Sequence, residues 1–364
     1  MKRGIITAAL AACILVCCAV PVWASLPNEV NDAMPDEARE LIEDLGGDAT
    51  DSTTLSEGAA LLWEKACALL TANFRSSVRV MVLLLGTVML YGVAESSFQA
   101  AGHPLAANFT PLAFVLVITM TAAGDMQTMM GAGAETMEQL NVLGKALLPT
   151  LAAAVAASGG IVSASVRQVA TVFFADLLMS LIQSVLLPLV YFYVAASAAN
   201  AMLPGAPLRR IAAGIKKVVT WALTASLLLF TGYLTMTGAA ATNADALTLR
   251  LTRTVISTAV PVVGGIISQA SGSVLSGAGL LKNTIGIFGM LAVLAVCLAP
   301  FVRLAVQYLL YKLVSFLAAT TGGGVLVELL DALGSAFGLV LGMVGSCALL
   351  LLISITSSVS VVIP

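Results

Sequence analysis

The chain has 364 residues, of which 59% are hydrophobic and only 10% are charged. Soluble domains are roughly 45–50% apolar and about 25% charged, so this composition excludes an ordinary water-soluble protein and indicates a bilayer as solvent. The net charge of -2 is unevenly distributed, since residues 25–64 hold eleven acids and one arginine, whereas fourteen basic and eight acidic residues follow them.

The first 24 residues are typical of an export signal. Lys2 and Arg3 precede an apolar run over residues 4–20, and a small-residue site ends at Ala24. We predict cleavage after Ala24. Two alternatives stay open, an uncleaved anchor and a lipoprotein signal that uses Cys13. In each case the following acidic head emerges outside the cytoplasm.

Residues 25–77 form this acidic, extracytoplasmic and juxtamembrane region, in which we expect short helices. Thr54 and Glu57 have the spacing of a capping box, in which each side chain satisfies a free amide at a helix start. The helix that follows carries Trp63 and Lys65, which suit the headgroup region. We therefore predict that it lies on or near the membrane surface.

The remaining chain, residues 78–364, is predicted to be a polytopic membrane domain with eight apolar segments, several of them shorter than the ~20 residues of a spanning helix. These segments are 78–94, 111–124, 147–166, 172–199, 218–241, 285–300, 304–319 and 337–362. Two connections, 126–148 and 244–281, are rich in small residues and lightly charged. That composition favours interfacial or re-entrant helices.

A short basic connection separates two of these segments and marks the cytoplasmic side. It contains Arg209, Arg210, Lys216 and Lys217. If the acidic head is outside, an odd number of crossings must precede this connection, whereas four apolar segments do. We predict that residues 147–166 do not cross fully, because Ser158, Gly159 and Gly160 interrupt them.

Two weakly similar helical repeats are predicted at residues 106–200 and 220–320, with residue 337 onward as a terminal addition. Pro149 and Pro261 are 112 positions apart, as are Pro188 and Pro300. Glycine-interrupted segments at corresponding places in two halves indicate a transport pathway in some membrane proteins. Close helix packing explains the same small residues without conduction.

No motif of an enzyme, a cofactor or a metal site is present. The single histidine, His103, falls in a predicted loop, and the three cysteines beyond the signal, Cys67, Cys297 and Cys347, are far apart and outside any CxxC pair. We therefore expect no enzymatic activity, no cofactor and packing roles for the cysteines.

Charged residues at membrane depth are the candidates for function, because a charge there is costly and normally faces protein or water. Asp176 and Arg303 could line an intramembrane polar path, and Asp176 could pair with Arg303 or Lys312. Alternatively, Arg303 and Lys312 could extend their charged ends to an interface.

The run Leu280-Leu281-Lys282-Asn283-Thr284 resembles a signature of the stage III sporulation protein AE family. Four further motifs, in the same order, strengthen this resemblance, as does the arrangement of signal, acidic head and polytopic body. The residues that carry it are Ser158, Gly159, Gly160, Arg250, Lys282, Asn283, Lys312, Gly322, Gly323 and Gly324.

The resemblance implies a role in endospore formation, in the mother-cell-derived outer membrane around the forespore. It implies partners from the same operon, which include ring-forming proteins and a secretion-type ATPase, and a forespore-side partner that completes a channel or feeding apparatus. The present chain would be the membrane component. Two other hypotheses stay open: an autonomous small-solute transporter, and an anchor for ring proteins that conducts nothing.

Overall fold

The computed structural model describes residue 39 and residues 55–101, 104–202, 206–259, 264–320 and 324–360, with the backbone alone over 249–276. This part of the chain is helical and contains no strand. Its elements are α4 (Leu55–Ala100), α5 (Pro104–Ala157), α6 (Ile161–Leu181), the π-turn η1 (Ile182–Leu186), α7 (Leu187–Met202), α8 (Ala206–Ala259), α9 (Gly264–Ala319) and α10 (Gly324–Val359). The prediction of an all-α polytopic protein is confirmed.

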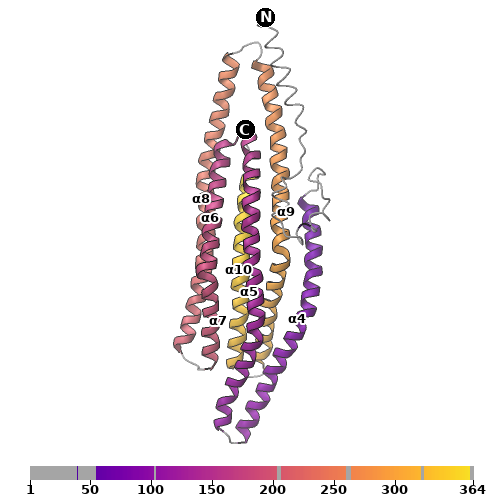
Figure 1. Cartoon of the computed structure of the whole chain (residues 1–364), viewed down its shortest axis with the longest axis vertical. Coiled ribbons are helices and arrows are strands. Elements are labelled where there is room, and N and C mark those ends of the chain that lie inside the picture. Colours follow the sequence, from indigo (N-terminus) through magenta and orange to yellow (C-terminus); the bar gives the residue numbers. More distant parts are fainter. Residues whose placement is uncertain are drawn as a thin grey trace.

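Six rods run up and down beside one another, because α6, η1 and α7 follow one another along a single rod (Figure 1). Six helices in the described part are long and apolar enough to cross a membrane. We conclude that the protein is a multi-pass membrane protein. Its surface between the ends carries many large exposed apolar side chains, among them Met89, Met120, Trp221, Leu228 and Met236.

Helix α10 lies at the centre of the bundle and packs against α5, α6, α7, α8 and α9. Its small residues explain its closest contact, the one with α9. A Cβ atom added at Gly334 would lie 3.2 Å from Cβ of Tyr311, and one at Gly338 would lie 3.0 Å from the Tyr308 ring. Glycines four residues apart let helix backbones approach closely. Residue 337 onward, predicted as a terminal addition to the repeats, belongs to this central helix, which starts at Gly324.

The eight predicted segments merge into six because helices continue across predicted gaps. Residues 126–148 lie inside α5, so the interfacial or re-entrant helix predicted there is not observed. Residues 147–166 end α5, make a turn at 158–160 and begin α6. Three rods therefore precede the basic connection, whose residues 209–217 lie in the first turns of α8 and not between helices. Three is the odd number that the charge argument requires.

Helix α4 runs without a break across the predicted boundary between residues 77 and 78. The helix expected on the membrane surface is the first half of this rod instead. Thr54 lies outside the described residues, so the capping box of Thr54 and Glu57 stays a prediction. Residues 1–24 and most of the acidic head lie outside the described residues.

The predicted repeats each contain two antiparallel helices, but the helix boundaries follow a different spacing. Both α5 and α8 have 54 residues, and they begin at Pro104 and Ala206, which are 102 positions apart rather than 112. Pro149 lies inside α5, whereas Pro261 falls between α8 and α9, outside the described residues. The repeat thus stays a prediction, and the helix boundaries do not support the spacing of 112 residues between its corresponding prolines.

The packing of α10 gives a matched test with two glycines. Alanine is favoured over glycine in a helix by about 1 kcal/mol, so Gly232→Ala, which places its Cβ in open space, should leave the melting temperature unchanged or raise it. Gly334→Ala should lower it, because the added Cβ would meet Tyr311 and the backbone nitrogen of Lys312. Thermal unfolding of the detergent-purified chain measures both. Equal responses would contradict this packing.

The order of the rods predicts on which side each turn lies. A cysteine at Ala157, beside the α5–α6 turn, should react with an impermeant thiol reagent added to intact cells. A cysteine at Thr320, between α9 and α10, should react only after permeabilisation. The host chain should lack Cys67, Cys297 and Cys347. Labelling of both positions from the same side would refute the arrangement.

Candidate functional site: polar clusters at the two ends of the bundle

The motif Ser158, Gly159 and Gly160 forms the tight turn between α5 and α6. Gly159 has φ 97°, a left-handed conformation that residues with a side chain rarely adopt. Its amide donates to the carbonyl of Ala156 at 2.9 Å, and the Gly160 amide donates to that of Val155 at 3.0 Å. The glycines therefore end α5 and allow α6 to start at once.

A carboxylate from another helix caps the start of α6. The two oxygens of Asp245, on α8, accept hydrogen bonds from the backbone amides of Val162 and Ser163, each at 2.9 Å. Asp245 is only 2% exposed. The first amides of a helix have no partner within the helix, and the helix dipole favours negative charge there. Asp245 supplies both the acceptors and the charge.

The guanidinium of Arg167 balances this buried carboxylate. Arg167 is 7% exposed, its charge interacts with that of Asp245, and its Nε donates to Oγ of Ser357 on α10 at 3.1 Å. Its Nη2 would lie 3.0 Å from a Cβ at Gly238, so the absence of a side chain on α8 makes room for it. One turn further along α6, Thr171 and Ser354 share a hydrogen bond.

Lys282, from the family-like motif on α9, completes the cluster. It is 6% exposed and lies close enough to Arg167 for their charges to repel. The cluster of Arg167, Asp245 and Lys282 thus joins α6, α8 and α9 at one end of the bundle, with Ser357 adding α10. Because its members come from four rods, it fixes their relative heights.

Sequence reasoning found Lys282 and the glycine turn but missed Arg167 and Asp245 as functional residues. A signal for Asp245 existed, since it is the single acidic residue between Asp176 and Glu328. It was missed because it stands in a small-residue segment that was interpreted as a connection.

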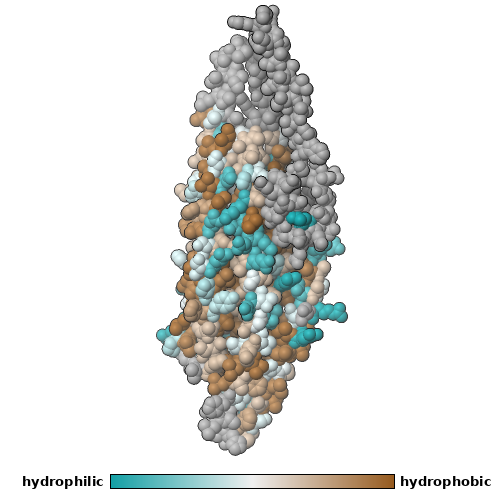
Figure 2. Space-filling model, viewed as in Figure 1, coloured by the Kyte–Doolittle hydropathy of each residue, from teal (hydrophilic) through white to brown (hydrophobic). Residues whose placement is uncertain are grey.

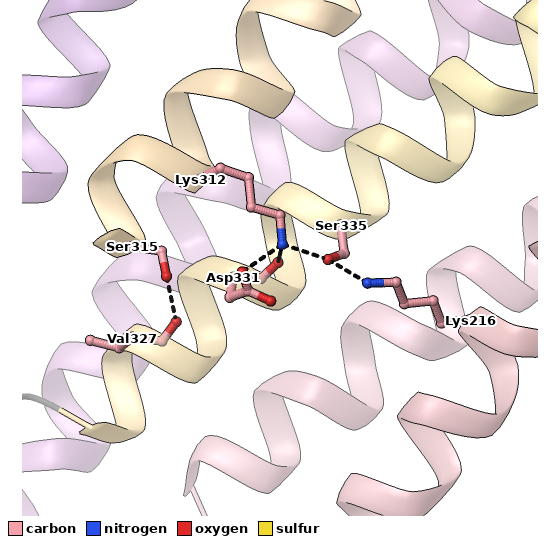
Figure 3. A network of polar contacts seen from close by, with 6 residues as sticks. All are labelled: Lys216, Lys312, Ser315, Val327, Asp331 and Ser335. Carbon is pink, nitrogen blue, oxygen red and sulfur yellow. Dashed lines mark hydrogen bonds and ion pairs between the residues drawn. The ribbon is translucent and has the colours of Figure 1, made fainter. Parts of the chain in front are cut away.

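A second polar cluster lies at the end of the bundle that carries the basic connection (Figure 3). Lys312 on α9 pairs with the Asp331 carboxylate on α10 and donates to Oγ of Ser335 at 3.0 Å. Lys216 on α8 donates to the same Oγ at 3.0 Å. Ser315 on α9 donates to the carbonyl of Val327 at 3.1 Å.

This cluster ties the start of α8 and the end of α9 to the start of α10. An ion pair between Arg209 and Glu328, at 3.2 Å, adds a contact at the rim, where both side chains are largely exposed. Lys312 could have reached a membrane interface alone or paired with Asp176. The structure gives it Asp331 and Ser335 as partners instead.

Asp176 and Arg303, the residues of the predicted polar path, lie on α6 and α9 and are not brought together. Asp176 forms an ion pair with Lys145 at 2.8 Å, with both side chains about half exposed. Arg303 is exposed and makes no ion pair with the described residues. Between the helices lies a cavity of only about 20 Å³, lined almost entirely by apolar side chains such as Met137, Leu178 and Leu350.

Of the other motif residues, Asn283, Gly324 and the backbone of Arg250 fall within the described part of the chain. Asn283 is exposed next to Lys282, and Gly324 begins α10. Only the backbone of Arg250 is described, and Gly322 and Gly323 lie outside the described residues. No group of histidine, cysteine and acidic residues that could hold a metal ion is found in the part searched.

Removal of the capping carboxylate should destabilise the protein. Asp245→Ala leaves two amides without acceptors and removes the carboxylate whose charge interacts with buried Arg167, and about 3–5 kcal/mol is expected when a buried pair is broken. Asp176→Ala removes a half-exposed ion pair, for which about 1 kcal/mol or less is expected. Thermal unfolding in detergent compares the two. Equal melting temperatures of the two variants would contradict a structural role for the cluster.

Comparison with known proteins gives two matches. A family model described as Stage III sporulation protein AE matches residues 38–361. The Stage III sporulation protein AE of Bacillus subtilis (strain 168) is 24% identical over 335 residues, which cover 92% of this chain and 82% of that protein. No solved structure matches significantly.

Proposed function

We propose that this chain is the polytopic membrane component of a channel between mother cell and forespore. The chain belongs to the stage III sporulation protein AE family and hence acts in sporulation. In this role it would sit in the outer forespore membrane and work without catalysis. Its partners would be other stage III sporulation proteins, namely ring-forming proteins, an ATPase and a forespore-side component. The family match over residues 38–361 carries the proposal.

The unequal lengths of the rods support a role between two compartments. Helix α8 has 54 residues, and at 1.5 Å per residue it is about 80 Å long, whereas the hydrocarbon core of a bilayer is about 30 Å thick. Asp245 marks the height of the α5–α6 turn, and α8 continues from there to Ala259. The α8–α9 hairpin therefore projects about 20 Å beyond that turn (Figure 1).

The two ends would serve different partners. By the charge rule, the end with the basic connection faces the cytoplasm, where an ATPase would bind. The projecting hairpin lies at the opposite end, on the side of the acidic head, and would reach ring proteins outside the membrane. Each end is held by its own polar cluster, so a partner at either end meets helices of fixed height.

Deletion of the gene and purification of the complex test the proposal. In the sporulating host, loss of the protein should stop forespore development after engulfment, and the tagged full chain should copurify with ring and ATPase components. Intact sporulation together with loss of uptake of one solute would instead support the autonomous transporter.

Shortening both arms of the α8–α9 hairpin by the same length tests whether the two ends of the bundle bind different partners. Deletion of residues 246–259 together with 264–277 removes 14 residues from each arm and leaves Asp245 and Lys282 in place. This variant should lose the ring proteins but keep the ATPase. Its elution as a single species in detergent controls for folding. Retention of the ring proteins would rule out the hairpin as their binding surface.

A further inference from the structure

Within the part of the chain that the structure describes, no helix covers one face of α5 along most of its length. Exposed positions recur at alternating intervals of four and three residues, the spacing at which one face of a helix meets another helix. They are Gly124, Thr128, Gly131, Glu135, Glu138, Val142, Lys145 and Pro149, which we call the α5 face.

The composition of the α5 face differs from that of a surface in contact with lipid. Exposed positions on α8 are large and apolar, as Trp221, Leu228 and Met236 show, whereas the α5 face has a single aliphatic residue, Val142. Figure 2 shows hydrophilic side chains gathered along the middle of this side of the molecule, where Figure 1 places α5. Lipid alone is a poor environment for such a surface.

The acidic residues of this face lie at mid-height in the bundle. Gly133 packs against Val340, close to the midpoint of α10, and against Leu304 of α9. Glu135 and Glu138 follow within two turns, and neither makes an ion pair with the described residues. A carboxylate at this depth is expected to face water or a basic group of another protein.

Two glycines of the face, Gly124 and Gly131, pack against no other described residue. A Cβ added at Gly124 or Gly131 would meet nothing within 4 Å, unlike one at Gly133, which would lie 2.8 Å from Val340. These two glycines therefore do not serve the packing of the bundle itself. Small residues on an outward face let a second helix approach closely.

A basic partner for the acids lies on the same molecule at the same height. Arg303 is next to Leu304, which contacts Gly133, and the exposed guanidinium makes no ion pair with the described residues. We propose that the α5 face binds a second copy of this chain about a two-fold axis along the membrane normal. Such an axis keeps every residue at its depth, so Glu135 and Glu138 meet Arg303 of the partner subunit.

The two-fold axis makes the contact reciprocal. Each copy supplies two acids and one base to the other, and the two α5 helices pack against each other through Gly124, Thr128 and Gly131. Lys145 is already neutralised by Asp176 and closes one end of the face. This inference does not rest on the proposed function, because the cost of a charge in lipid is the same for a channel, a transporter or an anchor.

Cysteine crosslinking in native membranes tests the proposal. In the full chain with Cys67, Cys297 and Cys347 replaced by serine or alanine, Thr128→Cys and Val142→Cys should each give a disulfide-linked dimer on oxidation. Leu228→Cys on α8, which is 68% exposed and on a helix that is not packed against α5, is the control and should stay monomeric. Equal crosslinking at the control, or crosslinks only to a different protein, would overturn it.

Charge exchange provides the second arm and distinguishes specific pairing from folding defects. Arg303→Glu should abolish the crosslink at Val142→Cys, and the triple variant with Glu135→Arg and Glu138→Arg should restore it. Elution of each variant as a single species in detergent checks its fold. Crosslinking that Arg303→Glu does not change would refute the proposed pairing.

Discussion

The whole arrangement depends on a buried carboxylate at the start of a helix. Asp245 binds the first free amides of α6 and balances Arg167, while Lys282 stands close by. Apolar side chains fix the distance between helices in a membrane protein but barely resist sliding along their axes, because lipid is as apolar as they are. A cluster of polar groups drawn from four rods does resist sliding. It sets how far α8 and α9 extend beyond the other helices.

The second polar cluster also fixes the relative heights of helices, at the other end of the bundle, but its ion pair is more exposed and therefore weaker. Lys312 and Asp331 are more exposed than Asp245, and an additional lysine, Lys216, shares the hydroxyl of the buried Ser335. The two polar clusters lie at opposite ends of the same helices and together prevent these helices from sliding along their axes. The helices between the clusters can then pack through glycines, such as Gly334 and Gly338, that demand an accurate register.

Much of the fold could be predicted from the sequence. The apolar runs identified the membrane segments, three rods precede the basic connection as the charge argument requires, and the glycine motif at 158–160 is the turn that interrupts a run. The number of helices was too high because hydropathy registers two polar or irregular stretches as gaps: the middle of α5, with Glu135 and Glu138, and the stretch around Pro300 and Arg303 inside α9. Helix α5 continues there, because a polar face on a long helix lowers the local hydropathy but does not disturb the backbone hydrogen bonds. Asp245 could not be assigned its role, because its partners at Val162 and Ser163 are 83 and 82 residues away.

The central place of α10 has a consequence for how the protein is made. Helix α10 follows α5, α6, α7, α8 and α9 in the chain and contacts all of them, so these helices are synthesised before the middle of the bundle can be filled. Until α10 enters, Arg167 lacks Ser357 and Lys312 lacks Asp331. A chain truncated before residue 324 would be inserted but left without a core. The bundle is therefore completed only after α10 has been synthesised.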